Sequence, residues 1–240
     1  MTVYFGLGEI GEAIAGRLNA EGIRLPFSRA AIFTLGDRRV ENIDNVELYV
    51  GISPFSFEVE RRFRASVQLR RLIRDGAPVL VVDMDSYEQR MANSELSSIS
   101  SVLIDEVSEL IRAIAKSGEG LDRLKSGAHV IYTQRDPKDV ASLAMAAARA
   151  VNSIDEIHVI ANNGSITPGD ANSIIRGLKM IGEPVSLSYV GNNGMMFEIV
   201  EGRLKLLDDD VIQRVLGDRV LDLDPEEAVN LPIPFLDRID

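Results

Sequence analysis

The chain opens on a short apolar strand that runs directly into a glycine-rich turn and a helix. Residues 3–5 are apolar, and Gly6, Gly8 and Gly11 follow with the spacing G-x-G-x-x-G before helically spaced apolar residues that end at Gly22. In such a turn the first glycine permits the tight bend, the second lets a phosphate approach the backbone, and the third lets helix and strand pack closely. The opening therefore predicts an α/β fold with an anion site at the helix N-terminus.

Apolar runs of strand length alternate with helical patterns along most of the chain. The runs that predict strands are residues 30–35, 46–52, 78–83, 128–133, 157–161, 185–190 and 195–200. The patterns that predict further helices are residues 55–73, 102–114, 140–151 and 170–181. This order predicts a Rossmann-like, doubly wound α/β fold with a mainly parallel sheet. The turn Gly191-Asn192-Asn193-Gly194 predicts a hairpin that adds an antiparallel edge.

The domain boundary is expected in the polar, serine-rich stretch at residues 86–101. We expect a Rossmann-like nucleotide-binding half over residues 1–95 and a second α/β half over residues 96–240, or one continuous domain. The second half includes the hairpin and a tail that carries prolines and apolar residues. Such a tail packs on the body or on a partner, so we expect a homo-oligomer.

Composition excludes several classes of protein and site. The 37 acidic and 26 basic residues give a net charge of −11, which argues against a nonspecific nucleic-acid binder. There is no cysteine and there are only two histidines, so disulfides, thiolate metal sites and cysteine nucleophiles are excluded and no metal centre is expected. No apolar run approaches the ~18 residues that span a bilayer. We expect a cytoplasmic protein that does not bind a membrane.

The first part of the chain resembles a known family. The residues VYFGLGEIGEAIAGRLNAEGI resemble the first β–α unit of NAD(P)-dependent dehydrogenases of the prephenate and β-hydroxyacid type. VELYVGISP at 46–54 is similar to the strand beneath the nicotinamide, which would place Ser53 at the cofactor, and the similarity ends weakly at RDGAPVLVVDMDS, residues 74–86. The resemblance covers about the first 90 residues. It implies NADP or NAD as cofactor and an oxidoreductase acting on a small metabolite.

Two placements of the ribose-reading residue fit the ~20-residue spacing after the glycines. If residues 23–27 form the second strand, Ser28 and Arg29 stand at its tip, a pair similar to those that accept a 2′-phosphate. If residues 30–35 form it, the tip carries Asp37 and Arg38, where the aspartate would bind ribose hydroxyls or the arginine a phosphate. Pro26 lacks a ladder donor and weighs against the first placement.

Catalytic side chains are scarce. Polar residues follow three predicted strands, and their loops could converge over the sheet: Asp83, Asp85, Arg135, Asn162 and Asn163. The two aspartates could hold Mg²⁺ through water, but we favour turn formation as their role. His129 and His158 lie at or near the starts of apolar strands, which indicates packing roles. Whether the protein is an enzyme stays open.

Two further functions remain as alternatives, each with a small-molecule ligand. A non-catalytic nucleotide-sensing module would oligomerise, and the opening motif also resembles regulatory Rossmann domains of potassium-transport systems. A nucleotide-dependent assembly protein of the tubulin and FtsZ kind also begins with a glycine-rich β–α loop. The second, glycine- and threonine-rich signature of that family is missing from residues 83–101.

Overall fold

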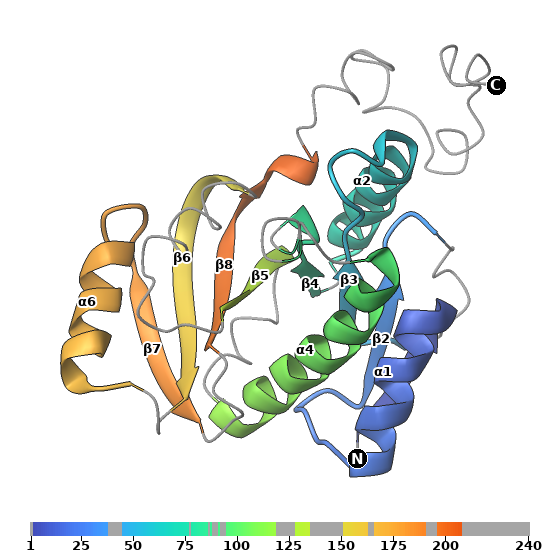
Figure 1. Cartoon of the computed structure of the whole chain (residues 1–240). Coiled ribbons are helices and arrows are strands. Elements are labelled where there is room, and N and C mark those ends of the chain that lie inside the picture. Colours follow the sequence, from blue (N-terminus) through green and yellow to red (C-terminus); the bar gives the residue numbers. More distant parts are fainter. Residues whose placement is uncertain are drawn as a thin grey trace.

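One eight-stranded sheet organises the chain, with strand order β1-β2-β3-β4-β5-β8-β6-β7 (Figure 1). The computed structural model describes residues 2–37, 45–76, 78–85, 87, 91, 95–118, 128–134, 151–162, 166–190 and 196–207. Its elements are β1 (Val3–Leu7), α1 (Gly8–Glu21), β2 (Arg29–Thr34), β3 (Leu48–Ile52), α2 (Val59–Arg74), β4 (Val79–Val82), α4 (Leu96–Ser117), β5 (Ala128–Gln134), β6 (Val151–Asn162), α6 (Pro168–Leu178), β7 (Val185–Val190), β8 (Met196–Leu204) and the short 3-10 helix η2 (Lys205–Leu207).

Strands β1 to β5 are all parallel and follow one another in chain order across the sheet. Their carboxyl ends therefore lie along one sheet edge, where the β1–α1 turn and the loops after β2, β3 and β4 come together. Parallel strands covered on both faces need continuous apolar runs, and β4 (VLVV) is buried throughout.

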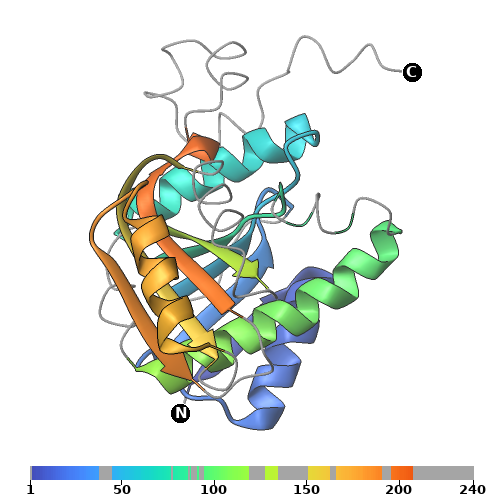
Figure 2. The same ribbon diagram turned by 60° about the vertical axis from the view of Figure 1, so that its left-hand side comes forward.

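Helices cover both faces of this parallel part. Ile14 and Leu18 of α1 and Leu103 of α4 share one core with alternate residues of β2, β3 and β4. Ala65 and Leu69 of α2 pack with the intervening residues on the opposite face (Figure 2). The β1–α1–β2 and β3–α2–β4 crossovers advance in the same direction with their helices on opposite faces, so the two crossovers have opposite hands.

The predicted fold class is confirmed: helices cover both faces of a mainly parallel sheet. The predicted late hairpin differs in its pairing, however. The antiparallel strand β8 lies between β5 and β6, and β7 pairs in parallel with β6 at the sheet edge. Phe197, Ile199 and Val200 of β8 are buried, which suits an interior strand. An Asn-Gly turn signals that the chain reverses and leaves the next pairing partner open.

Two other boundaries differ from prediction. Helix α4 already begins at Leu96, inside the stretch expected to be irregular, because Ile99 and Leu103 continue the buried face of the helix. The predicted helix over 140–151 mostly falls outside the described residues, and Val151 begins strand β6. The sheet continues from β4 through β5 to β8, and the division at residue 95 stays a proposal.

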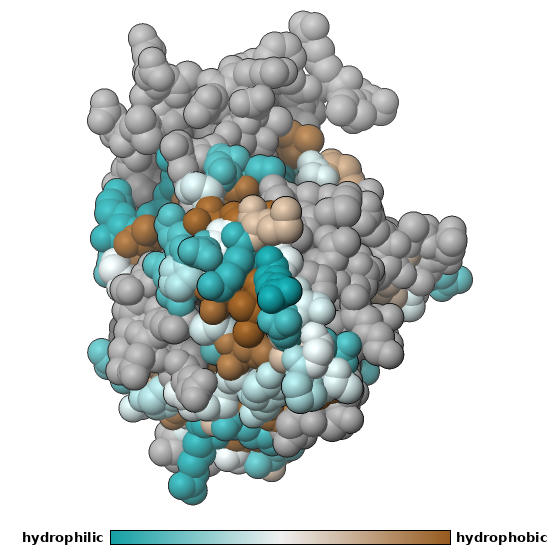
Figure 3. All heavy atoms as spheres, turned by 90° about the vertical axis from the view of Figure 1, so that its left-hand side faces the viewer, coloured by the Kyte–Doolittle hydropathy of each residue, from teal (hydrophilic) through white to brown (hydrophobic). Residues whose placement is uncertain are grey.

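Helix α6 begins two residues before the start at residue 170 that the sequence predicted. Thr167 caps it by accepting the Asp170 backbone N–H, Asp170 caps back in return, and Pro168 occupies the first turn. Figure 3 looks onto the side of the molecule that carries α6 and β7, where apolar side chains form a strip among polar ones. No helix in the described part of the chain is long and apolar enough to cross a membrane.

Candidate functional site

The three glycines of the turn meet two different physical requirements. A Cβ at Gly6 would lie 2.3 Å from the carbonyl oxygen of Gly11, and one at Gly11 would lie 2.3 Å from that of Ile32. Gly6 and Gly11 thus let α1 pack closely against β1 and β2. Gly8 adopts φ +74°, and a Cβ there would meet no atom within 4 Å. Gly8 therefore supplies a backbone conformation that other residues disfavour, with its open side toward a pocket.

The tip of β2 is fastened to α2. Gly36 (φ +83°) leaves no room for a side chain, because a Cβ would lie 2.4 Å from the carbonyl oxygen of Arg61. The Gly36 N–H donates to Oε1 of Gln68, at 2.9 Å. Asp37 then accepts two hydrogen bonds from Arg61, at 2.8 Å each. Arg61 also donates to Glu58, so its guanidinium joins the tip of β2 to the loop after β3.

Burial and ion pairing act on Arg61 in opposite directions. Burial by itself lowers the pKa of the guanidinium, but the hydrogen bonds to Asp37 and Glu58 outweigh it and raise the pKa above its usual value. Arg61 therefore stays cationic at every physiological pH.

The loop after β3 carries an aromatic pair. Phe55 and Phe57 stack with ring centroids 5.0 Å apart and an interplanar angle of 11°. Phe55 is buried, whereas Phe57 is 62% exposed. Oε2 of Glu58 accepts the Phe55 backbone N–H at 3.0 Å, which fixes the loop. Phe57 therefore presents an exposed apolar ring at the pocket.

Two aspartates follow β4, and they have different environments. Oδ1 of Asp83 accepts the Ser53 hydroxyl at 3.3 Å, and the Ser53 oxygen in turn accepts the Met84 N–H. Burial, followed by the negative charge of Asp85, raises the pKa of Asp83 to about 6 against the opposing effect of Arg62. Asp85 accepts from Arg62 at 3.1 Å and from the Ser56 N–H at 2.7 Å. Both carboxylates thus brace the loop after β3.

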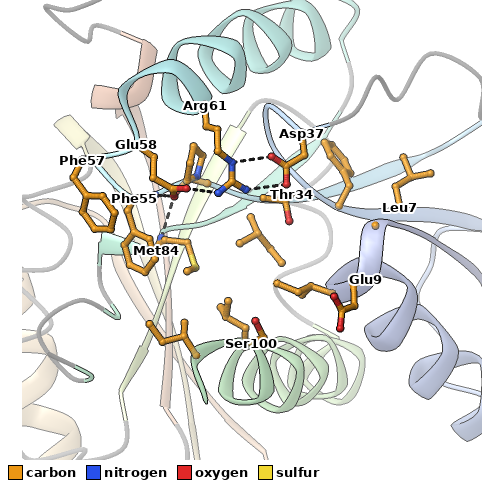
Figure 4. Close-up of a pocket in the computed structure, with 18 residues that line it drawn as sticks. Leu7, Glu9, Thr34, Asp37, Phe55, Phe57, Glu58, Arg61, Met84 and Ser100 are labelled. Carbon is orange, nitrogen blue, oxygen red and sulfur yellow. Dashed lines mark hydrogen bonds and ion pairs between the residues drawn. The ribbon is translucent and has the colours of Figure 1, made fainter. Parts of the chain in front are cut away.

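These segments enclose a pocket of about 510 Å³ at the carboxyl ends of the parallel strands (Figure 4). The first turns of α4 close it opposite α2. Its lining residues are Leu7, Gly8, Glu9, Ile10, Phe33, Thr34, Asp37, Ile52, Ser53, Pro54, Phe55, Phe57, Glu58, Arg61, Met84, Ile99, Ser100 and Leu103. Figure 4 shows Arg61 between Asp37 and Glu58 on one side of the pocket, and Glu9 and Ser100 on the other.

The lining combines an apolar floor with a charged rim. Among the described lining residues the acids are Glu9, Asp37 and Glu58, and the one cation is Arg61. Such a site can hold a planar apolar group on its floor and one anionic group at Arg61 or at the N-terminus of α1. No group of three or more His, Asp or Glu residues in the described ranges is placed to hold a metal ion.

The structure brings some of the predicted site residues together and separates others. Gly8, Asp37 and Ser53 all line the pocket. Ser28 and Arg29 lie at the amino end of β2, the opposite end from the pocket. The Ser28 N–H donates to Glu47, and Arg29 lies over the Phe5 ring.

Residues 23–27 are therefore not the second strand. Thr2 holds them as a loop, because its hydroxyl contacts the Leu25 and Phe27 carbonyl oxygens at 3.1 and 2.9 Å and accepts the Leu25 N–H. The second placement, with the strand tip at Asp37, is the one the structure adopts. Arg38 lies outside the described residues.

The remaining sequence candidates are the two histidines and the polar residues after β5 and β6, and the structure describes the side chain of His158 among them. His158 is buried on β6, and its ring nitrogens lie 2.7 and 3.1 Å from the Ser186 and Ser188 hydroxyl oxygens of β7, in agreement with a packing role. Arg135 and Asn163 lie outside the described residues, as do the side chains of His129 and Asn162.

Sequence reasoning missed Arg61, Glu58 and Phe57. Arg61 belongs to an arginine-rich helix in which nothing distinguishes one arginine from another. A signal was nevertheless present in the sequence, because Phe57 lies between two polar residues just after an apolar run of strand length, where loops often carry functional residues.

Comparison with known proteins adds the fold family. No protein-family model and no curated protein match the chain. Solved structures do match. The GTPγS-bound protofilament of CetZ2 from Haloferax volcanii superposes with a TM-score of 0.53 at 16% identity, covering 88% of this chain and 74% of that one. CetZ from Methanosaeta thermophila gives 0.52 at 12% identity, covering 83% and 68%. A mutant FtsZ from M. jannaschii gives 0.50 at 16% identity, covering 83% and 74%.

The chain has the FtsZ/CetZ fold. This finding corrects the resemblance to prephenate and β-hydroxyacid dehydrogenases, and with it NADP or NAD as cofactor and the oxidoreductase activity. A glycine turn between a strand and a helix is a solution for close packing and anion binding that more than one fold uses. In the dinucleotide-binding fold, moreover, the glycine turn follows a central strand and the ligand spans the point where strand order reverses. Here β1 lies at the sheet edge.

Proposed function

We propose that this protein binds a guanine nucleotide in the pocket between α1, α2 and α4 and assembles into homo-oligomers through a surface that includes the pocket mouth. The observation that carries the proposal is the position of this pocket, at the glycine turn and the strand ends of a FtsZ/CetZ fold. The solved relatives include a GTPγS-bound protofilament and a GDP-bound monomer of CetZ proteins.

The local geometry supports a nucleotide as ligand. The open side of Gly8 and the N-terminus of α1 suit a phosphate, because the first N–H groups of a helix have no partner within the helix. The apolar floor suits a planar group, and a volume of about 510 Å³ is in the range of small-molecule sites.

One sequence feature bears on whether a bound nucleotide would also be hydrolysed. No glycine occurs between Gly76 and Gly118, so the segment between β4 and α4 lacks the glycine-rich signature of tubulin and FtsZ proteins. Backbone contacts to a phosphate chain need the close approach that glycine allows. With fewer backbone contacts the phosphates would be positioned less firmly for hydrolysis. A sensing and assembly role with little or no hydrolysis is therefore the second candidate, and phosphate release measured beside assembly separates it from a GTPase.

A thermal-shift titration tests binding. A ligand at 100 times its dissociation constant stabilises the folded state by about 2.7 kcal/mol. We expect GTP and GDP with Mg²⁺ to raise Tm, and ATP and NADPH, the two controls, to leave it unchanged. Sedimentation of the same samples should show larger species with GTP than without nucleotide. An equal shift with all four compounds, or with none, would contradict the guanine-nucleotide proposal.

A further inference from the structure

Arg61 is the one basic side chain that the described pocket lining contains. It extends from the first turns of α2 into the rim, as Figure 4 shows, and its side chain is 37% exposed. A guanidinium at that place presents the planar fork that matches a phosphate group. Arg61 is thus in position to receive an anionic ligand.

Two carboxylates already occupy this guanidinium. Nε and Nη2 of Arg61 donate to the two oxygens of Asp37, both at 2.8 Å, and Nη1 donates to Oε1 of Glu58. Together with Glu9, the described rim carries three carboxylates against one cation. An incoming phosphate must therefore compete with a carboxylate for Arg61.

The two carboxylates are held differently. The carboxylate of Asp37 pairs with Arg61 at the tip of β2, and its side chain is 43% exposed. Glu58 is more buried, and its other oxygen accepts the Phe55 N–H. Asp37 can therefore turn toward solvent at little cost, whereas displacing Glu58 would also disturb the loop that carries Phe57. The competition is between the ligand and Asp37.

This inference rests on the proposed function. We propose that Arg61 binds a phosphate group of the nucleotide, and that Asp37 is the ion-pair partner of Arg61 until the phosphate replaces it. Binding exchanges one ion-pair partner for another, and no covalent bond is formed or broken. Asp37 thus weakens binding in proportion to its hold on Arg61, which makes it a residue that sets the affinity of the site without touching the ligand.

The test compares Asp37→Asn with Asp105→Asn. Asp105 pairs with Arg17 through one contact of 2.6 Å on the surface between α1 and α4, outside the pocket lining, so its replacement removes the same charge and another exposed Asp–Arg ion pair. Dissociation constants are measured by calorimetry for GTP, ATP and inorganic tripolyphosphate, each with Mg²⁺. We expect Asp37→Asn to tighten binding of every phosphate ligand that the protein binds, by up to about fivefold, the factor that corresponds to the free energy of one exposed ion pair.

Asp105→Asn should change these constants by no more than about twofold, because salt screens a distant surface charge. The double variant Asp37→Asn/Arg61→Gln should lose the gain. The proposal is overturned if Asp37→Asn tightens binding no more than Asp105→Asn does, or if the double variant keeps the gain.

The same titrations keep the two proposals apart. If tripolyphosphate and ATP bind as tightly as GTP and Asp37→Asn still tightens them, the guanine-nucleotide proposal fails and the role of Arg61 stands. If GTP binds selectively but Asp37→Asn has no effect, the role of Arg61 fails alone. If neither the wild-type protein nor Asp37→Asn binds any of the three ligands, both proposals fail.

Discussion

Arg61 on α2 and Asp37 at the tip of β2 form a two-pronged ion pair, with Nε and Nη2 each 2.8 Å from one carboxylate oxygen. The pair ties the start of a helix on one face of the sheet to the carboxyl end of a parallel strand. It lies on the rim of the pocket, so the charge that a ligand meets there is set by this contact.

Replacing Asp37 by Asn should change stability little. Both side chains of the pair are more than one-third exposed, and exposed ion pairs contribute about 0–1 kcal/mol. We therefore expect urea unfolding of Asp37→Asn to show a loss of less than about 1 kcal/mol. A larger loss would mean that the pair holds β2 and α2 together. A change in ligand affinity of this variant would then reflect its weaker folding and not the competition for Arg61.

Asp83 should make stability depend on pH. Its pKa is raised from 3.8 to about 6, so the folded state binds the proton more tightly than the unfolded state does. The free energy of unfolding should then fall as pH rises from about 4 to about 6, by about 2–3 kcal/mol, and stay at the lower level above that.

Asp83→Asn keeps an acceptor for the Ser53 hydroxyl and cannot ionise. It should lack this part of the pH dependence and gain stability over the wild type above pH 6. The measurement is denaturant unfolding of both proteins between pH 4 and pH 8. Parallel curves for the two proteins would show that Asp83 ionises without cost in the folded state.

Gly8 and Gly16 offer a matched pair in α1. Gly16 has open space around it and ordinary helical backbone, so Gly16→Ala should stabilise the protein by about 0.5–1 kcal/mol. Gly8 also has open space but adopts φ +74°, so Gly8→Ala should destabilise it, by about 1 kcal/mol. Thermal unfolding compares the two, and equal effects would show that the Gly8 conformation is not required.

Phe57 should contribute to assembly more than to folding. Its side chain is 62% exposed at the pocket mouth, so Phe57→Ser removes little buried area. Met180, 87% exposed just beyond the end of α6, provides the control Met180→Ser. Analytical ultracentrifugation with GTP should show weaker association for Phe57→Ser and none of that loss for Met180→Ser. The reverse order would place the interface on the α6 side.

Local signals in the sequence predicted most elements but few of their partners. Gly22 ends α1 with φ +65°, as the sequence predicted, because caps act over a few residues. The place of β8 between β5 and β6 depends on contacts between distant segments, which no turn motif encodes. The glycine turn was found for the same local reason, and its assignment to a dehydrogenase failed because the turn does not specify strand order.

The candidate site was predicted in part. Gly8, Asp37 and Ser53 line the pocket, because residues that follow parallel strands meet at one edge. Arg61 was missed since it comes from a helix, and its approach to Asp37 depends on the packing of Gly36 against α2. Long-range packing of this kind leaves no pattern along the chain.

Calorimetric titration of Mg²⁺-GTP into the wild type, Ser100→Phe and Ser101→Phe tests the central claim most directly. Ser100 lines the pocket from α4, and its neighbour Ser101 is exposed outside the lining. A ring at position 100 should fill part of the cavity and weaken GTP binding by about tenfold or more, while Ser101→Phe should bind like the wild type. Equal GTP affinity in all three proteins, or no binding to the wild type, would contradict a guanine-nucleotide site in this pocket.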